Sequence, residues 1–368
     1  MNPPDDPTGR LLAPRQRSRI SAAKPPHSAP RRSAWRFGAA LTLMAAVAVI
    51  GKWLWPPAGK APATASLPIR QAPPSRGVAA FVSAAAPIPP AAVTSEPGRA
   101  PAPLTSLSEL LQRLGSAGLR WSRFKTNPAI VVIEFPTLQE QGLAMNRLAA
   151  MFEKRTAHGD RVPTEKELDE LLRRSGDSIA SFYQGHDYPA AKVAQFFSLA
   201  EAQRAALNAR ELQLRSLLLE AELMQRDAAG AFHAMPGQAV ISFTGVQPDD
   251  PATAPDELVD GVRREAVLHH ELSHGEFFTN PAYRTHCMKF WREVLRENER
   301  RMFSAYLKGL DYNPADEVLM ANETQALLMH TPDSRAFNAG SLGISESALA
   351  QLRGRFRAGE PAYGLKGL

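Results

Sequence analysis

The pentamer His270-Glu271-Leu272-Ser273-His274 contains residue types at a spacing that could perform metal chemistry. Residues i and i+4 of an α-helix lie on one face, so His270 and His274 can both direct a ring nitrogen at one ion. Glu271 follows His270 directly, so its carboxylate can reach a water beside that ion without binding the ion itself. The pattern therefore predicts metal-assisted hydrolysis, with two nitrogen ligands, an open coordination position and a base for the water.

A solvated helix face with two hydrogen-bonded histidines is the alternative interpretation of the pentamer. Metal chemistry requires that the segment be helical, that a strand precede it and that a third ligand follow. Residues 238–244 are rich in apolar side chains and predict the preceding strand. Asp256 is predicted to cap a helix that carries the pentamer, and Gly275 and Asn280 are predicted to bring that helix to its end.

The third ligand is expected on a later helix, predicted over residues 314–329. There Asn322-Glu323 is followed three residues on by Ala326. An H-E-x-x-H pentamer followed by an N-E-x-x-A segment on a later helix resembles the gluzincin group of zinc metallopeptidases. The two short motifs span about sixty residues, and the resemblance implies a zincin-like domain that binds one Zn²⁺ ion.

Carried over to this chain, the resemblance implies zinc ligands at His270, His274 and Glu323, with Glu271 as general base and acid. Some gluzincins have an aspartate four residues after the third ligand, where it pairs with a ligand histidine. Here that position is Leu327, so the sequence leaves the partner that orients the ligand histidines unidentified.

Other residues compete with Glu323 for the third position. His269 lies about 100° around the helix from His270, and Glu276 faces elsewhere, so both are poor co-ligands. Asp316 and Glu317 stand near the start of the helix that carries Glu323, where acids are common because of the helix dipole alone. The other competitors are His286 and His330.

His330 also suggests a second role, because it lies seven residues after Glu323 on the same helix face. It could hydrogen-bond the oxyanion of a tetrahedral transition state, although a capping or core histidine is the favoured interpretation. Alternative donors are Tyr283, Tyr306 and Tyr312. The only cysteine, Cys287, is interpreted as a core residue, and a single cysteine excludes an intramolecular disulfide and a cysteine-rich zinc site.

Charge is divided unevenly along the 368 residues. Residues 1–104 hold 13 Lys and Arg against 3 Asp and Glu, whereas residues 105–368 hold 30 against 34. The excess positive charge therefore belongs to the N-terminal part, and the predicted folded domain is mildly acidic. This balance argues against a nucleic-acid surface on that domain.

The N-terminal part predicts a membrane tether. Residues 1–36 indicate a disordered basic arm in the cytoplasm, and residues 37–55 indicate one transmembrane helix flanked by Trp35 and Trp53. The uncharged run of 15 residues is short for a bilayer core of about 30 Å. A signal peptide cleaved after Ala65, which would release a secreted form, is the alternative to a single-pass inner-membrane anchor.

The rest of the chain predicts a linker and one domain. Residues 56–104 contain 12 prolines and many alanines, as is typical of an extended, semi-rigid linker. Residues 105–368 predict a predominantly α domain of the α+β class with a small sheet. Strands are predicted over residues 128–135 and 238–244, with helices over 107–114, 138–154, 164–174, most of 188–226, and 281–310.

Together these patterns favour a membrane-anchored zinc metallopeptidase that hydrolyses peptide bonds of a substrate in the cell envelope, on the periplasmic side. Two alternatives remain open. One is a catalytically silent zincin-like module for binding or assembly in the envelope, although an intact Glu271 argues against it. The other is a cell-wall amidase, which would use the same chemistry on a different substrate.

Overall fold

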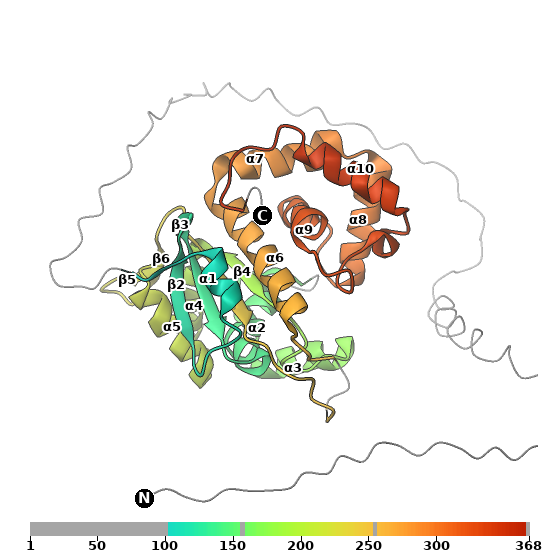
Figure 1. The fold of residues 1–368 in the computed structure, drawn as a ribbon. Helices are drawn as coiled ribbons and strands as arrows, with labels where there is room; N and C mark the ends of the chain where they lie inside the picture. Colours follow the sequence, from blue (N-terminus) through green and yellow to red (C-terminus); the bar gives the residue numbers. More distant parts are fainter. Residues whose placement is uncertain (1–101, 155–158, 253–255, 366–368) are drawn as a thin grey trace, which may run out of the picture. The chain divides into compact units, whose positions relative to one another are not determined.

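The computed structural model describes residues 102–154, 159–252 and 256–365 (Figure 1). The predicted basic arm of residues 1–36, the predicted anchor of residues 37–55 and nearly all of the predicted linker lie outside this part. Within the described ranges, no helix combines the length and the apolar character needed to cross a membrane. The described part is predominantly helical with a small mixed sheet, as the sequence predicts.

Seven strands form one five-stranded sheet and one hairpin in the described ranges. The strands are β1 (Leu104–Thr105), β2 (Arg120–Phe124), β3 (Asn127–Phe135), β4 (His186–Pro189), β5 (Met224–Arg226), β6 (Phe232–Ala234) and β7 (Ala239–Thr244). The large sheet has the order β1-β2-β3-β7-β4, and β5 pairs with β6. β3 and β7 run parallel at its centre, while β4 pairs antiparallel with β7 and forms one edge.

Ten α-helices complete the described fold, with a π-helical turn at Phe290–Val294 and a 3₁₀ turn at Ala339–Leu342. The helices are α1 (Leu107–Gln112), α2 (Leu138–Phe152), α3 (Glu165–Ser175), α4 (Ala190–Gln203), α5 (Ala209–Glu220), α6 (Gly261–Thr279), α7 (Pro281–Lys289), α8 (Glu297–Gly309), α9 (Glu317–His330) and α10 (Glu346–Arg357).

The central strand β3 is buried on both faces because successive side chains point in opposite directions. Val131 and Ile133 join the cluster formed with α2, α4 and α5, whereas Ile130 and Val132 join the cluster formed with α6. β3 and β7 occupy the two segments in which the sequence predicts strands. A strand covered on both faces gives a continuous apolar run, and this is the pattern that makes both strands recognisable.

Helix α6 connects the sheet with the C-terminal helices. It contacts β7 and β4 on one side and α9 on the other, and Figure 1 shows it between these two groups. Gly275 lies where α6 meets β3, and a Cβ there would come within 2.9 Å of the Ile130 side chain. Gly275 therefore permits close packing of α6 on the sheet and does not end the helix, which continues to Thr279.

The N-terminal boundary of α6 differs from the prediction. Asp260, not Asp256, is the N-cap, and its side chain accepts from the Arg263 backbone N–H. Asp256 instead accepts from the Leu258 backbone N–H and pairs with the Arg263 guanidinium. Asp256 and Asp260 have the same intrinsic propensity to cap a helix, so the contacts of their side chains decide which one begins α6.

Two long helices predicted from the sequence are broken in the structure. The prediction of helix over most of residues 188–226 is wrong at both ends, because Tyr188 lies in the edge strand β4 and residues 224–226 form β5. The helix predicted over residues 281–310 divides into α7 and α8, which are separated by the π-helical turn and by Leu295 in extended conformation. Leu295 is buried in the C-terminal cluster, and this packing outweighs its helical propensity.

Candidate metal centre

The two motifs converge where α6 packs against α9. His270 and His274 lie one turn apart on α6, and Glu323 lies on α9. Nε2 of His270 is 3.7 Å from Glu323 Oε2, and Nε2 of His274 is 3.8 Å from Glu323 Oε1. One ligand atom from each of the three residues therefore lies within 4.8 Å of the others.

This arrangement fits a metal ion. Two ligands on a tetrahedral zinc ion lie about 3.4 Å apart when each bond is about 2.0–2.1 Å long. The two distances between nitrogen and oxygen exceed that separation by only a few tenths of an ångström. Burial lowers the pKa of His274 to about 4, so its ring is neutral at pH 7 and keeps a lone pair for an ion.

Thr331 sets the orientation of the His270 ring. Its Oγ1 lies 2.8 Å from His270 Nδ1 and donates its own hydrogen to the Ala326 carbonyl oxygen at 3.0 Å. Because that hydrogen is committed, Thr331 accepts from Nδ1–H and leaves Nε2 without a hydrogen on the side of Glu323. Thr331 is therefore the partner of a candidate ligand histidine that the sequence could not identify.

Replacing Thr331 by Val should weaken metal binding about 10- to 100-fold, because His270 loses its acceptor and its preferred tautomer. Thr331→Ser keeps the hydroxyl and should bind metal nearly as well as the wild type. Zinc affinity measured against a competing chelator tests this. Equal affinities for the Val and Ser variants would contradict the role of the hydroxyl.

Glu271 points into the same space without binding a partner. Its side chain is buried, and its Oε2 has no hydrogen-bond partner among the described residues. Burial raises the pKa of Glu271 well above its usual value, and the negative charges of Glu323 and Glu153 raise it further. A buried, unpaired carboxyl with a raised pKa beside two candidate ligand histidines has the properties of a general base.

Gly185 makes room for the Glu271 carboxyl. A Cβ at residue 185 would overlap the side chain of Glu271, including Oε1 and Cδ. Gly185 immediately precedes β4, so the backbone at the start of the edge strand lies against the Glu271 side chain. A glycine in this position is explained by close approach of the backbone to a functional side chain.

Gly185→Ala should therefore displace the Glu271 carboxyl and reduce hydrolysis by about a hundredfold or more, because catalysis depends sharply on the position of the base. Metal binding should persist, since the ligands lie on α6 and α9. Gly354→Ala in α10 is the matched control, because its added Cβ meets open space. Full activity of the Gly185→Ala enzyme would contradict the proposed position of the base.

A cavity of about 380 Å³ opens onto the candidate centre, and its lining includes further acids. Asp187 on β4 has its Oδ2 3.8 Å from His274 Nε2, and it forms a second group of potential ligands with Glu271 and His274. Burial and the charge of Glu271 raise the pKa of Asp187 well above its usual value. The sequence reasoning missed Asp187, because the four-residue edge strand carries no pattern that marks it as part of a site.

Glu153, at the end of α2, also lines the cavity. Burial raises its pKa to about 7, and the hydroxyls of Tyr188 and Tyr183 partly oppose that shift, whereas Glu323 adds to it. The sequence reasoning missed Glu153 as well. Glu153 stands more than a hundred residues before the pentamer, and only the fold brings the two segments together.

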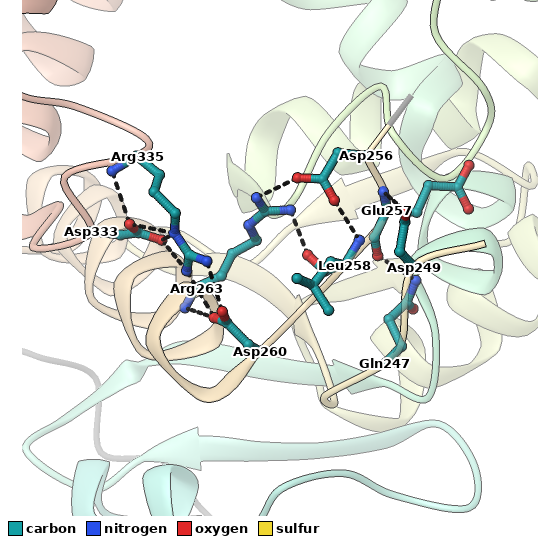
Figure 2. Close-up of polar contacts among 9 residues, drawn as sticks. All are labelled: Gln247, Asp249, Asp256, Glu257, Leu258, Asp260, Arg263, Asp333 and Arg335. Carbon is teal, nitrogen blue, oxygen red and sulfur yellow. Dashed lines mark hydrogen bonds and ion pairs between the residues drawn. The ribbon is translucent and has the colours of Figure 1, made fainter. Parts of the chain in front are cut away.

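Two arginines line the mouth of the cavity, and Figure 2 shows that both are paired. Arg335 binds Asp260, the N-cap of α6, and Asp333, which follows α9. Arg263 donates to Asp256 and to the Leu258 carbonyl oxygen. Arg335 therefore ties the start of one ligand-bearing helix to the segment that follows the other.

The structure places His330 away from the cavity lining. Its Nε2 lies 3.1 Å from the Tyr283 hydroxyl, and burial lowers its pKa to about 3. This placement favours the interpretation of His330 and Tyr283 as core residues over that of transition-state donors. Of the three alternative tyrosine donors, Tyr312 alone lines the cavity. Cys287 is buried in the C-terminal cluster, as predicted.

The remaining competitors for the third ligand position have other contacts. Glu276 accepts from the Gly364 backbone N–H, and His286 donates to the Phe356 carbonyl oxygen. Asp316 caps α9, and Glu317 pairs with Arg292 at the surface. None of these residues lines the cavity, and His269 does not line it either.

The chain was compared with protein-family models, curated proteins and solved structures, and it matches none of them. The interpretation of the site therefore depends on its own residues and geometry. Those residues are buried His, Glu and Asp groups that can hold a metal ion beside an unpaired carboxyl.

Proposed function

We propose that this chain is a zinc-dependent hydrolase of the gluzincin type, which cleaves peptide bonds in a peptide or protein substrate of the cell envelope. The observation that carries the proposal is the convergence of His270, His274 and Glu323 beside the unpaired carboxyl of Glu271. The same constellation serves amide hydrolysis by metallohydrolases in general.

The donor set supports zinc as the ion. Two imidazole nitrogens and one carboxylate are ligands that zinc accepts, and three protein ligands leave one position open for catalysis. His270, His274 and Glu323 would hold the ion. When bound, zinc polarises a substrate carbonyl and makes a neighbouring water more acidic.

Glu271 then moves the protons. Its carboxylate takes a proton from the attacking water, and the protonated carboxyl delivers that proton to the leaving nitrogen of the cleaved amide. A raised pKa suits the second step, because the carboxyl must hold the proton until the nitrogen accepts it. Gly185 and the edge strand keep the carboxyl in place beside the ligands.

The unpaired carboxyl also bears on the alternative of a silent binding module. Burying a carboxylate without a partner costs several kcal/mol, and a scaffold that needs only the three ligands gains nothing in return. A cell-wall amidase would use the same four residues, so only the substrate separates it from a peptidase.

Digestion of a complex peptide pool by the full-length chain, followed by mass spectrometry, tests the proposal. We expect new peptide termini that accumulate with time and that require zinc. A pool that stays intact at equimolar enzyme with zinc bound would contradict peptidase activity, and cleavage of cell-wall stem amides under the same conditions would favour the amidase.

A further inference from the structure

The cavity carries more negative charge than one metal ion can balance. Its lining includes six carboxyl groups. Those of Asp256 and Asp333 are paired with arginines, and the other four belong to Glu153, Asp187, Glu271 and Glu323. A single divalent cation offsets two of these charges. Burial of the remaining charges is costly unless another cation or a proton accompanies them.

The cations nearest the mouth are already occupied. Arg335 is paired with Asp260 and Asp333, and Arg263 is paired with Asp256, as Figure 2 shows. Asp256 and Asp333 also line the cavity, so each arginine at the mouth is matched by an acid beside it. The mouth therefore contributes no net positive charge to the interior.

Lys154 lies behind the aromatic wall of the cavity and not within it. Its Nζ is 4.5 Å from the ring centroid of Phe182 and 4.6 Å from that of Tyr183. Tyr183 and Tyr312 line both the catalytic cavity and the adjacent one that contains Lys154. From there its positive charge attracts Glu153 and opposes the rise in the pKa of that carboxyl, so Lys154 and one divalent ion together offset three of the four charges.

Two unsatisfied polar atoms of the lining accept hydrogen bonds. Glu271 Oε2 and Gln184 Oε1 are buried acceptors without a partner among the described residues. A lining of acceptors and aromatic faces is complementary to a group that has several donors and a positive charge, such as an ammonium or a guanidinium group.

We propose that this cavity binds a cationic group of the substrate, an ammonium or guanidinium close to the scissile bond, through Glu153 with Asp187 and the Tyr183 ring. The inference rests on the proposed function and specifies its substrate class. Lysine and arginine side chains and a free amino terminus share this chemistry. Glu153 is the residue that selects for the charge, since it lies outside the set of metal ligands and the base.

Matched peptides test the selection. Two synthetic pools that differ only in lysine or its neutral isostere norleucine are digested by the zinc-loaded full-length chain, each with free and with acetylated amino termini. We expect at least about tenfold faster cleavage of the lysine pool, because a neutral side chain leaves buried acceptors unpaired. A rate that falls on acetylation instead identifies the amino terminus as the cation. Equal rates for all four pools would overturn the proposal.

Two variants test whether Glu153 causes the preference for a cationic substrate group. Glu153→Gln should bring the ratio of lysine to norleucine cleavage, or of free to acetylated cleavage, close to one. Asp256→Asn also removes a carboxylate from the lining, but one that Arg263 neutralises, and it should leave the ratio unchanged. A ratio that falls equally in both variants would indicate a general field effect and contradict a specific role for Glu153.

Binding separates a failure of this inference from a failure of the proposed function. Isothermal titration of the zinc-loaded wild-type chain with lysine amide and norleucine amide needs no turnover. We expect the lysine amide to bind at least about tenfold more tightly, even if no peptide is cleaved. Equal affinities for the two amides would overturn the cationic site, and so would a second zinc ion bound per chain in place of the organic cation.

Discussion

Replacing Glu271 by Gln is expected to reduce hydrolysis by at least about a hundredfold while zinc stays bound. The amide has nearly the size of the carboxyl, and His270, His274 and Glu323 are untouched. It can neither take a proton from the attacking water nor give one to the leaving nitrogen. General acid–base catalysis contributes about 10²- to 10⁴-fold, or about 3–5.5 kcal/mol of barrier.

The measurement is kcat/KM for a cleaved peptide together with the zinc content of the same preparation. Glu265→Gln is the matched control, because Glu265 is an exposed acid on the same helix. It should retain activity and zinc. Hydrolysis by Glu271→Gln within a few-fold of the wild type would rule out the proposed role of Glu271.

Replacing Glu323 by Ala is expected to remove metal binding and activity together. Glu323 is buried and offers one oxygen to each candidate ligand histidine, so its removal takes away the third ligand. Residues that hydrogen-bond to a metal ligand contribute about 10- to 100-fold to metal affinity. Loss of a ligand itself should lower the affinity by more than that. Glu323→Ala should therefore differ from Glu271→Gln, which keeps its zinc.

Zinc content by plasma emission spectrometry, measured after dialysis, distinguishes the two variants. The control is Glu317→Ala, which removes an exposed acid from the first turn of the same helix and breaks only a surface pair with Arg292. It should hold about one zinc per chain, like the wild type. Undiminished zinc in Glu323→Ala would assign the third ligand position to another residue, with Asp187 the nearest candidate.

The sequence predicted the part of the site that local spacing encodes. A four-residue interval on one helix face brings His270 and His274 together wherever the helix packs, so the pair can be recognised without the fold. Glu323 was predicted from a second short motif, and the packing of α6 against α9 brings it within 4 Å of both rings. The strands β3 and β7 were predicted for a similar reason, because apolar runs reflect burial directly.

The residues that complete the site could not be predicted, because they depend on contacts between distant segments. Thr331 becomes the partner of His270 only through the packing of α9 and its C-terminal turn on α6. Asp187 reaches His274 only because β4 pairs with β7 at the edge of the sheet. Glu153 reaches the cavity only because α2 ends beside it. Each of these side chains would look like an ordinary polar residue in its own segment.

Reversible dependence of hydrolysis on zinc tests the central claim most directly. The full-length chain is assayed on a cleaved peptide, then stripped of metal with a chelator, freed of chelator and titrated with zinc. We predict loss of hydrolysis on stripping and full recovery near one equivalent of zinc, with no recovery in the His270→Ala/His274→Ala double variant. Hydrolysis that persists in the stripped wild-type chain, or equally in the double variant, would contradict the assignment of this site as a zinc hydrolase centre.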